Sequence, residues 1–446
     1  MIEEQHPLTI VSPVDPAKIE LLTQLLFQIQ NPDIENNTLV PFCKIKTVHF
    51  ARFVIIQTDD TYPAQLAFSS DFDGDEQLHF GELIKEANEG LCQIYSCCTG
   101  FNGDLRRYWA RHKVPTKAFY NGHLKMPQQQ IKRDNVLRET IAGFLDDNYK
   151  EGTIKGLSAI EIKKMIAESI RKDNKFEWLD TKEAKSGNYF SKNKTLITAL
   201  AMLLVALIVV IFLVVKISHL IAISTFVGFL ILLACLVILF FLLKKKLNNL
   251  EIADATGIDR TSSKHAKELM NAENFQVQNQ LTHLVEIKAG SFRLRLLNLV
   301  LGAINFLAKT VYNKGKLGGI PSIHFARWLM IDNNKRLLFF SNFDGSWESY
   351  LGDFVDKAAV GLTGVWSNTK YFPRTHNLVQ KGATDEQQFK EWARYFQIST
   401  QVWYSAYKTL SVENINNNAL IRAGLFQEMN EHDAQLWLDQ IFYYNG

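Results

Sequence analysis

The sequence predicts an α+β fold in which two βαββαβ repeats pack sheet to sheet as one barrel, with a two-helix transmembrane hairpin between them. Two observations predict it: two long uncharged apolar runs lie mid-chain, and short motifs recur in the same order on both sides of them. The predicted parts are a first repeat at 1–149, an amphipathic linker at 150–194, the hairpin at 195–243, a linker at 244–279 and a second repeat at 280–446.

The apolar runs are Thr195–Val215 and Leu220–Leu243. Each is long enough to cross a hydrocarbon core of about 30 Å. Only Lys216–His219 joins them, so the hairpin returns the chain to the side it came from. Lysines flank the hairpin more densely than its turn, which predicts that both termini and both soluble halves are cytoplasmic, at a bacterial inner membrane. The alternative is a hairpin that enters one leaflet without crossing, which the span length disfavours.

Composition excludes several classes of protein. The formal net charge is +3 with 21% charged residues, and no concentrated basic region predicts a nucleic-acid partner. The five cysteines form no CxxC pair, so neither a zinc site nor a disulfide framework is predicted. The expected partners are therefore the lipid bilayer, a small apolar ligand and, for a homo-oligomer, further copies of the chain.

The recurring motifs indicate an internal duplication. Thr47–Phe53 (TVHFARF) matches Ser322–Trp328 (SIHFARW), and a Phe-Asp-Gly stretch follows each. The other matches keep the same order: Leu8-Thr9 with Leu281-Thr282, Trp109–Arg111 with Trp392–Arg394, and Pro115–Tyr120 with Ser399–Tyr404. Ordered matches of this kind are typical of a repeated structural unit.

Each repeat is expected to run strand, helix, strand, strand, helix, strand, from its apolar periodicity and turn residues. In the first repeat these elements are Leu8–Val11, Ala17–Gln30, Val48–Thr58, Gln65–Asp71, Glu76–Glu89 and Leu91–Ser96. In the second they are Leu281–Ile287, Phe292–Val311, Ile323–Ile331, Arg336–Phe343, Trp347–Ala359 and Leu362–Trp366. Extensions follow at Leu105–Phe144 and Asn377–Phe426, and Ser158–Lys172 is an amphipathic helix that packs on its own domain or lies at the bilayer surface.

The βαββαβ order is the ferredoxin-like pattern, whose sheet has one face free of helices. A second copy of the unit would cover that face. In order, pairing and core residues the chain resembles the dimeric α+β barrel superfamily over residues 7–100 and 280–370. That resemblance implies a cofactor-free monooxygenase, a haem-binding chlorite dismutase or dye-decolourising peroxidase, or a ligand-binding protein. The HFARW stretch and Ser341–Phe354 (SNFDGSWESYLGDF) look closer to an uncharacterised bacterial membrane-protein group, which implies no activity.

The candidate catalytic residues are the matched pairs His49 with Arg52 and His324 with Arg327. Side chains three apart on a strand point to opposite faces, so both enter one space only where a bulge intervenes. In the functional interpretation the histidine is a haem ligand, a general base or a donor to an anion that the arginine clamps. In the structural interpretation all four are buried against carboxylates or carbonyls. Retention in both copies favours the structural interpretation.

Three further expectations concern the surroundings of these pairs. Asp73 and Asp344 precede a helix and are expected to cap it, with the following glycine in a tight turn. An aromatic pocket is expected beside His324, formed by Trp328, Trp347, Trp366 and Trp403. The cofactor is unknown; haem is considered, although Phe-Asp-Gly departs from the GxxDG stretch of dye-decolourising peroxidases.

The leading functional hypothesis is a membrane-anchored, cytoplasm-facing double barrel that binds a small apolar or lipid-derived ligand. Its enzymatic version is an oxidoreductase with monooxygenase- or peroxidase-like chemistry. The alternative is a non-catalytic membrane scaffold or interaction protein. The two differ in one structural respect, since the scaffold would have a filled barrel with no cavity beside His49 or His324.

Overall fold

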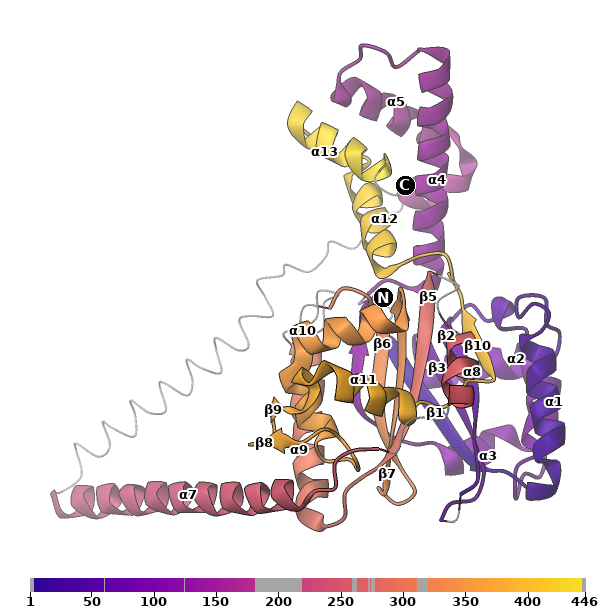
Figure 1. Ribbon diagram of the computed structural model, residues 1–446. Coiled ribbons are helices and arrows are strands. Elements are labelled where there is room, and N and C mark those ends of the chain that lie inside the picture. Colours follow the sequence, from indigo (N-terminus) through magenta and orange to yellow (C-terminus); the bar gives the residue numbers. More distant parts are fainter. Residues whose placement is uncertain are drawn as a thin grey trace. The chain divides into compact units, whose positions relative to one another are not determined.

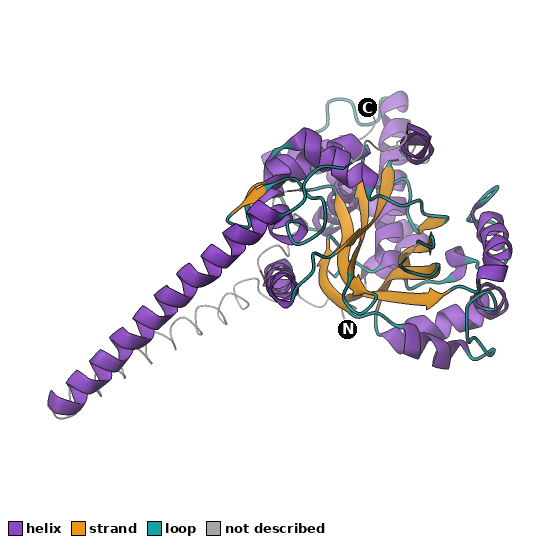
Figure 2. Ribbon diagram, turned by 60° about the horizontal axis from the view of Figure 1, so that its bottom comes forward, coloured by secondary structure: helices purple, strands orange, loops and turns teal. Residues whose placement is uncertain are grey.

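The computed structural model describes residues 4–59, 61–123, 125–180, 219–258, 263–271, 273, 277–310 and 320–442. They form two compact units, one of Met1–Ile166 with Asp254–Gly446 and one of Ala167–Ala253. The described strands all belong to the first unit, which is a mixed α+β structure (Figure 2).

The first sheet takes three strands from the N-terminal half of the chain and one from near the C-terminus (Figure 1). Its order is β1 (Gln5–Pro13), β3 (Gln65–Asp73), β2 (Val48–Ile56) and β10 (Val402–Ser405), and every pair is antiparallel. The sheet is therefore completed by a strand that comes from the other half of the chain.

The second sheet is built in the reciprocal way. Its antiparallel order is β4 (Thr116–Asn121), β6 (Ile323–Ile331), β7 (Arg336–Asp344) and β5 (Gln278–Glu286). Here β4 is the strand from the N-terminal half. Each half of the chain thus gives its last strand to the sheet of the other half.

Backbone bonds also link the outer edges of the two sheets. Just before β4, the Val114 N–H donates to the Thr9 carbonyl of β1 at 2.9 Å. Just before β10, the Ile398 N–H donates to the Thr282 carbonyl of β5 at 3.0 Å. Each exchanged strand therefore leaves the edge of one sheet and enters the edge of the other.

Helices cover the outer face of each sheet. The first sheet packs against α1 (Ile19–Gln30), α2 (Glu76–Tyr95) and α3 (Leu105–His112). The second packs against α9 (Ser291–Thr310), α10 (Trp347–Trp366) and α11 (Glu386–Tyr395). Apolar side chains at helical spacing form these two layers, as the sequence pattern predicts.

The inner faces of the two sheets face each other and enclose a third layer, which we call the inter-sheet core. At one end it is aliphatic and aromatic, with Val54, Ile56, Ala67, Leu329, Ile331, Leu338 and Phe340. A second cluster in the same layer includes Phe50, Phe325 and Tyr407. Sheet-to-sheet packing of this kind buries the faces that the helices leave open.

The predicted fourth strands, Leu91–Ser96 and Leu362–Trp366, are wrong. Both segments are the last turns of helices α2 and α10. Leu83, Ala87, Leu91 and Ile94 are all buried, so the apolar stripe of α2 continues through the predicted strand at helical spacing. The actual fourth strands are β4 and β10, in the stretches that contain Tyr120 and Tyr404.

A group of helices stands at one end of the sheets (Figure 1). It comprises α4 (Gln128–Glu151), α12 (Val412–Gly424) and α13 (Glu431–Phe442), which pack on one another. α5 (Ala159–Lys172) is the predicted amphipathic helix, and its Lys163 Nζ donates to the Leu425 carbonyl at 3.0 Å. The remaining elements are short: Pro16–Lys18, Phe42–Lys44, Asn174–Asp180, α8 (Ser263–Asn271), β8 (Thr375–His376), β9 (Gln380–Lys381) and Gly382–Thr384.

Two described helices are long and apolar enough to cross a membrane. α7 (His219–Ala253) contains the predicted span Leu220–Leu243; the most apolar 18-residue window within Phe226–Ala253 has a mean hydropathy of 3.3, and no residue of that window is buried. The second is α9, with a mean hydropathy of 1.3, but α9 packs on β4 and α10 within the first unit. The other predicted span, Thr195–Val215, lies outside the described residues.

Candidate functional site

Both HFAR stretches carry a β-bulge at the histidine. The register of β2 against β3 shifts across His49, and that of β6 against β7 shifts across His324. An extra residue in one strand reverses the side to which the following side chains point. Each histidine therefore faces the inter-sheet core together with Arg52 or Arg327. This is the one arrangement that allows both members of a pair into the same space.

Each arginine crosses the inter-sheet core and binds the opposite sheet. Arg52 donates from Nη1 to the Leu281 carbonyl of β5 at 3.0 Å and from Nη2 to the Ser341 carbonyl of β7 at 2.9 Å. Arg327 makes the equivalent bonds to carbonyls of β1 and β3, at 2.9 Å and 3.1 Å. The two guanidinium groups thus link the sheets reciprocally, through the planar set of donors that suits several carbonyls at once.

Among the described residues, one carboxylate, that of Asp71, lies between the two guanidinium groups. Asp71 of β3 accepts a hydrogen bond from Arg327 Nη2. The residue at the matched position of β7 is Asn342, and its Oδ1 accepts from Arg52 Nη2 at 2.5 Å. Asn342 Nδ2 in turn donates to Asp71 Oδ2 at 3.1 Å. Burial lowers the pKa of Arg52 to about 9, so the group stays charged at neutral pH. Burial raises the pKa of Asp71, and the two arginines oppose that rise.

His49 connects the inter-sheet core to helix α4. Its Nε2 lies 2.8 Å from Asp73 Oδ1, and its Nδ1 lies 2.8 Å from the Tyr407 hydroxyl. The second carboxylate oxygen of Asp73 accepts from the backbone N–H of Gln128, the first residue of α4, at 2.7 Å. The residue before it, Pro127, has no side-chain cap bond. Asp73 therefore supplies the capping acceptor of α4 from a distant strand.

His324 makes the corresponding connection to helix α12. Its Nε2 lies 2.6 Å from Asp344 Oδ1, and the other oxygen of Asp344 accepts from the N–H of Val412, the first residue of α12, at 2.7 Å. On its other side, His324 Nδ1 lies 2.6 Å from Nε2 of His123. One of these two rings donates and the other accepts.

Sequence reasoning missed His123 and Tyr407. They follow the matched Tyr120 and Tyr404 by three residues each, so the repeat alignment brings them to one position. Because the two aligned residues are of different types, a histidine and a tyrosine, a search for identical residues does not pair them. Burial, followed by the charges of the neighbouring histidines, lowers the pKa of His123 well below its usual value, and burial raises that of Tyr407. Both side chains are therefore neutral partners of the matched histidines at physiological pH.

The prediction that Asp73 and Asp344 cap the helices directly after them is wrong. Asp75 caps α2 by accepting from the Leu78 N–H at 2.8 Å, and Ser346 caps α10. The two aspartates instead point back to the histidines and to the starts of α4 and α12. The accompanying glycines behave as predicted, since Gly74 and Gly345 both have φ near the left-handed region at 79°.

These contacts leave the matched residues without access to a substrate. His49 and His324 are 0% exposed, and Arg52 and Arg327 are 2% and 1% exposed. Both ring nitrogens of each histidine are already hydrogen-bonded, so binding haem iron would require breaking one of these bonds. Among the described residues, no cluster of His, Cys, Asp and Glu is placed to hold a metal ion.

The tryptophans expected around His324 do not gather there. Trp328, Trp347 and Trp366 belong to the layer between the second sheet and its helices. Trp328 follows Arg327 directly and so points to the opposite face of β6. Only Trp403 lies in the inter-sheet core, where its Nε1 donates to Asn342 Oδ1 at 3.0 Å.

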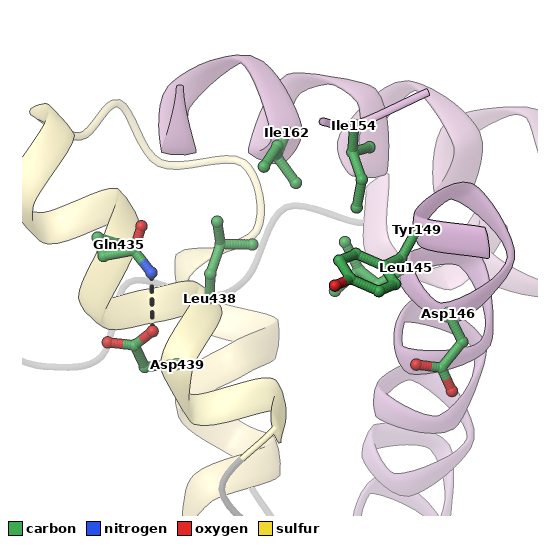
Figure 3. Close-up of a pocket in the computed structure, with 8 residues that line it drawn as sticks. All are labelled: Leu145, Asp146, Tyr149, Ile154, Ile162, Gln435, Leu438 and Asp439. Atoms are coloured by element: carbon green, nitrogen blue, oxygen red, sulfur yellow. Dashed lines mark hydrogen bonds between the residues drawn. The ribbon is translucent and has the colours of Figure 1, made fainter. Parts of the chain in front are cut away.

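Hollows lie outside the inter-sheet core, and three of them are lined by residues of elements named above. The one in Figure 3 measures about 420 Å³ and lies between α4, α5 and α13; Ile154, Ile162 and Leu438 form its apolar side, and Asp439 is bonded to Gln435 at 2.8 Å. A polar hollow of about 340 Å³ is lined by Lys46, Thr47, Arg133 and Asp73, among others. The third, of about 410 Å³, lies between α9 and α10 and includes Trp328 in its wall.

Comparison of the chain with protein-family models, with curated proteins and with solved structures finds no match.

Proposed function

We propose that this chain is a membrane-anchored, non-catalytic interaction protein, built as a duplicated ferredoxin-like unit whose two halves form one α+β barrel. The observation that carries the proposal is the completeness of the inter-sheet core. Every matched residue that could do chemistry there is enclosed and holds two elements together. In this network both matched histidines and both arginines are fully engaged, and the Nδ1 of His123 is the buried atom left without a partner among the described residues. A buried polar network whose charged members are bonded rigidifies a fold, and such a core supports a rigid body that presents surfaces.

The duplication is supported by the equivalence of the contacts. Arg52 and Arg327 bond to carbonyls on opposite sheets in the same pattern. Asp73 and Asp344 each join a histidine to the first residue of a helix, α4 or α12. The exchange of β4 and β10 supports a closed barrel, since neither sheet has its fourth strand from its own half.

The oxidoreductase hypothesis has less support. A general base must reach the proton that it removes, and a haem ligand must offer a free nitrogen. His49 and His324 meet neither condition in this arrangement. The ligand-binding part of that hypothesis keeps its support only outside the inter-sheet core, where the hollows lie.

The proposed location is the cytoplasmic side of a bacterial inner membrane, with a two-helix hairpin as anchor. The support from the structure is α7, whose apolar residues are exposed over a length sufficient to span a bilayer. The support from the sequence is Lys244, Lys245 and Lys246, which follow the second apolar run and favour the cytoplasmic side.

Hydrogen exchange at the histidine C2 position, measured by mass spectrometry, tests the enclosed core without a known ligand. We expect His49 and His324 to exchange far more slowly than the exposed His376 and His432 of the same protein in mild detergent. Haem added to this sample should give no Soret shift. If His49 or His324 exchanged at the rate of the exposed histidines, the inter-sheet core would contain an open cavity. That result would contradict the proposal and support the catalytic hypothesis.

A further inference from the structure

The helices at the end of the sheets are unequal in length, although two of them start at matched places. α4 and α12 both begin beside a carboxylate that a core histidine holds, Asp73 or Asp344. Gly424, the last residue of α12, therefore corresponds to Thr140 of α4, and α4 continues for 151 − 140 = 11 residues beyond it. At about 1.5 Å per residue, the extension 141–151 adds about 16 Å that has no counterpart in α12.

A preformed hollow opens beside this extension of α4. Its volume is about 420 Å³, and its lining comes from the extension, from the connection to α5, from α5 and from α13 (Figure 3). The lining residues all belong to one compact unit, and the connections α4–α5 and α12–α13 are fully described. Two contacts fix the walls: Glu431 of α13 accepts from the Ala159 N–H of α5 at 2.5 Å, and Lys163 of α5 donates to the Leu425 carbonyl at 3.0 Å.

The deep part of the hollow is apolar. Leu145 of α4 and Leu438 of α13 are buried, at 2% and 5% exposure, and Ile154 and Ile162 are half-buried. Figure 3 shows these side chains pointing into the space from different sides. Tyr149 also belongs to the lining and is 78% exposed, so it lies at the mouth. An exposed aromatic side chain beside an apolar hollow is typical of a surface that contacts another molecule.

The edge of the hollow is negatively charged. The exposed polar side chains of the lining are Asp146, Gln435 and Asp439, so both charged groups in the lining are carboxylates. The helix that carries Asp439, α13, has three carboxylates and no lysine or arginine. Such an edge attracts a cationic partner and repels an anionic one.

An apolar side chain with lysine or arginine on both sides of it matches both parts of the hollow. Protein interfaces commonly place an apolar anchor in a preformed pocket and charged groups at the rim. A helix that binds a groove presents such anchors at positions i, i+3, i+4 and i+7. An acyl chain fits less well, because its carboxylate or phosphate group would face Asp146 and Asp439.

From these observations we infer that the hollow between α4, α5 and α13 is a docking site for a basic amphipathic helix of a partner protein. A leucine or phenylalanine of that helix occupies the apolar part, and its lysines or arginines lie against Asp146 and Asp439. The inference rests on the proposed interaction function and names the surface that serves it.

The test uses the full-length protein in phosphatidylcholine nanodiscs and a fluorescent designed peptide, a helix with leucines on one face and lysines around them. Fluorescence anisotropy, with empty nanodiscs as the baseline, should show saturable binding. A second peptide with glutamates in place of the lysines should bind at least about tenfold more weakly, because its charges repel the edge of the hollow.

The charge at the edge is tested by the double variant Asp146→Asn with Asp439→Asn. It should weaken binding of the lysine peptide by about three- to tenfold, as expected for two exposed charge contacts. Asp147→Asn is the matched control, since it removes a neighbouring exposed carboxylate of α4 that does not line the hollow, and it should change little.

The apolar part is tested by Ile154→Gln, which makes the wall polar and should weaken the lysine peptide by at least about tenfold. Leu157→Gln, in the same connection but outside the lining, should leave binding unchanged. Thermal unfolding establishes that each variant is folded. If Ile154→Gln unfolds, the aspartate variants decide the test, because they keep the apolar packing.

Absence of saturable binding by the lysine peptide, or equal binding of the two peptides, would overturn the inference. Binding that is unchanged in the double aspartate variant would do the same. Binding that appears only after removal of residues 443–446 would assign the hollow to the chain's own C-terminus instead. The histidine exchange rates test the enclosed core separately, so slow exchange without peptide binding would reject this site and leave the proposed function standing.

Discussion

At the residue scale, the inter-sheet core holds two guanidinium groups and one carboxylate between them. Asp71 and Asn342 occupy matched places, yet only Asp71 carries a charge. Breaking a buried ion pair typically costs about 3–5 kcal/mol, because a charge is left unpaired in a poorly solvated place. Arg52 has no carboxylate of its own at the matched position. Its charge is instead stabilised by hydrogen bonds to several carbonyl and amide oxygens. The core is thus equivalent in geometry but unequal in charge.

His283 is the buried histidine whose removal we expect to change acid stability. It lies between Trp366 and Trp392, with ring centroids 4.8 Å and 4.6 Å away, and neither ring nitrogen has a partner among the described residues. Burial lowers its pKa to about 3. The unfolded chain therefore takes up a proton below about pH 6.5 while the folded chain does not, so stability is complete above that pH and falls as the pH drops towards 3.

The substitution His283→Ile removes the titrating group and therefore this loss of folding stability at acidic pH. The first half already has Ile10 at the matched position. Near pH 7 we expect little change, since lost aromatic contacts offset the removal of two unpaired nitrogens. At pH 5 the variant should be more stable than the wild type by about 2 kcal/mol, which is the free energy of 1.5 pKa units. Thermal unfolding at both pH values measures this, with the exposed His376→Asn as control. Parallel pH profiles for variant and wild type would contradict it.

The sequence predicts the members of the core better than their neighbours. His49, Arg52, His324 and Arg327 are identifiable because they recur, and the burial of all four agrees with the structural interpretation. The bulge that turns His and Arg to the same side of the sheet is a feature of the backbone, and the residue types of HFAR do not predict it. The predicted aromatic pocket assumes that residues near His324 in the sequence also lie near it in space. Successive side chains on a strand alternate between its two faces, so Trp328 points away from the inter-sheet core.

At the element scale, matched glycines in α2 and α10 should respond in opposite ways to alanine. Gly361→Ala meets no described atom, and a helix interior gains about 1 kcal/mol from that exchange. Gly90→Ala would place its Cβ 1.8 Å from the backbone oxygen of Leu39, so the connection before β2 must move away. We expect a higher thermal midpoint for Gly361→Ala and a lower one for Gly90→Ala. Equal increases would mean that Leu39 does not pack on α2 as the structure shows.

The elements themselves were predictable where one periodicity dominates. The strand Ile323–Ile331 and the start of its neighbour at Arg336 are as predicted, because an apolar run and a turn at Asp332 to Lys335 bound them. The error at Leu91–Ser96 arose where a short apolar run fits both a strand and a helix end. Long-range pairing then decided the outcome, since β10 already occupies the outer side of β2. Single-sequence periodicity does not contain that information.

At the scale of the whole molecule, the hairpin proposal predicts that both termini share one side of the membrane. Reporter fusions at Met1 and at Gly446 should both be active in the cytoplasm and inactive as periplasmic reporters. A fusion truncated within the turn, after Ile217, should report the periplasm and is the matched control. Termini on opposite sides would exclude the hairpin, and a cytoplasmic signal at the turn would indicate that the apolar runs enter one leaflet only.

The strand exchange also sets an order of events during synthesis on the ribosome. β2 ends at Ile56, and its outer neighbour begins at Val402, which is 402 − 56 = 346 residues later. At about 5–20 residues per second, the nascent chain carries an unpaired strand edge for roughly 20–70 s. An open edge invites pairing with other chains. α7 leaves the ribosome within that interval, so on the proposed hairpin arrangement membrane insertion would precede completion of either sheet. The unpaired outer side of β2 is therefore exposed to other chains until β10 emerges.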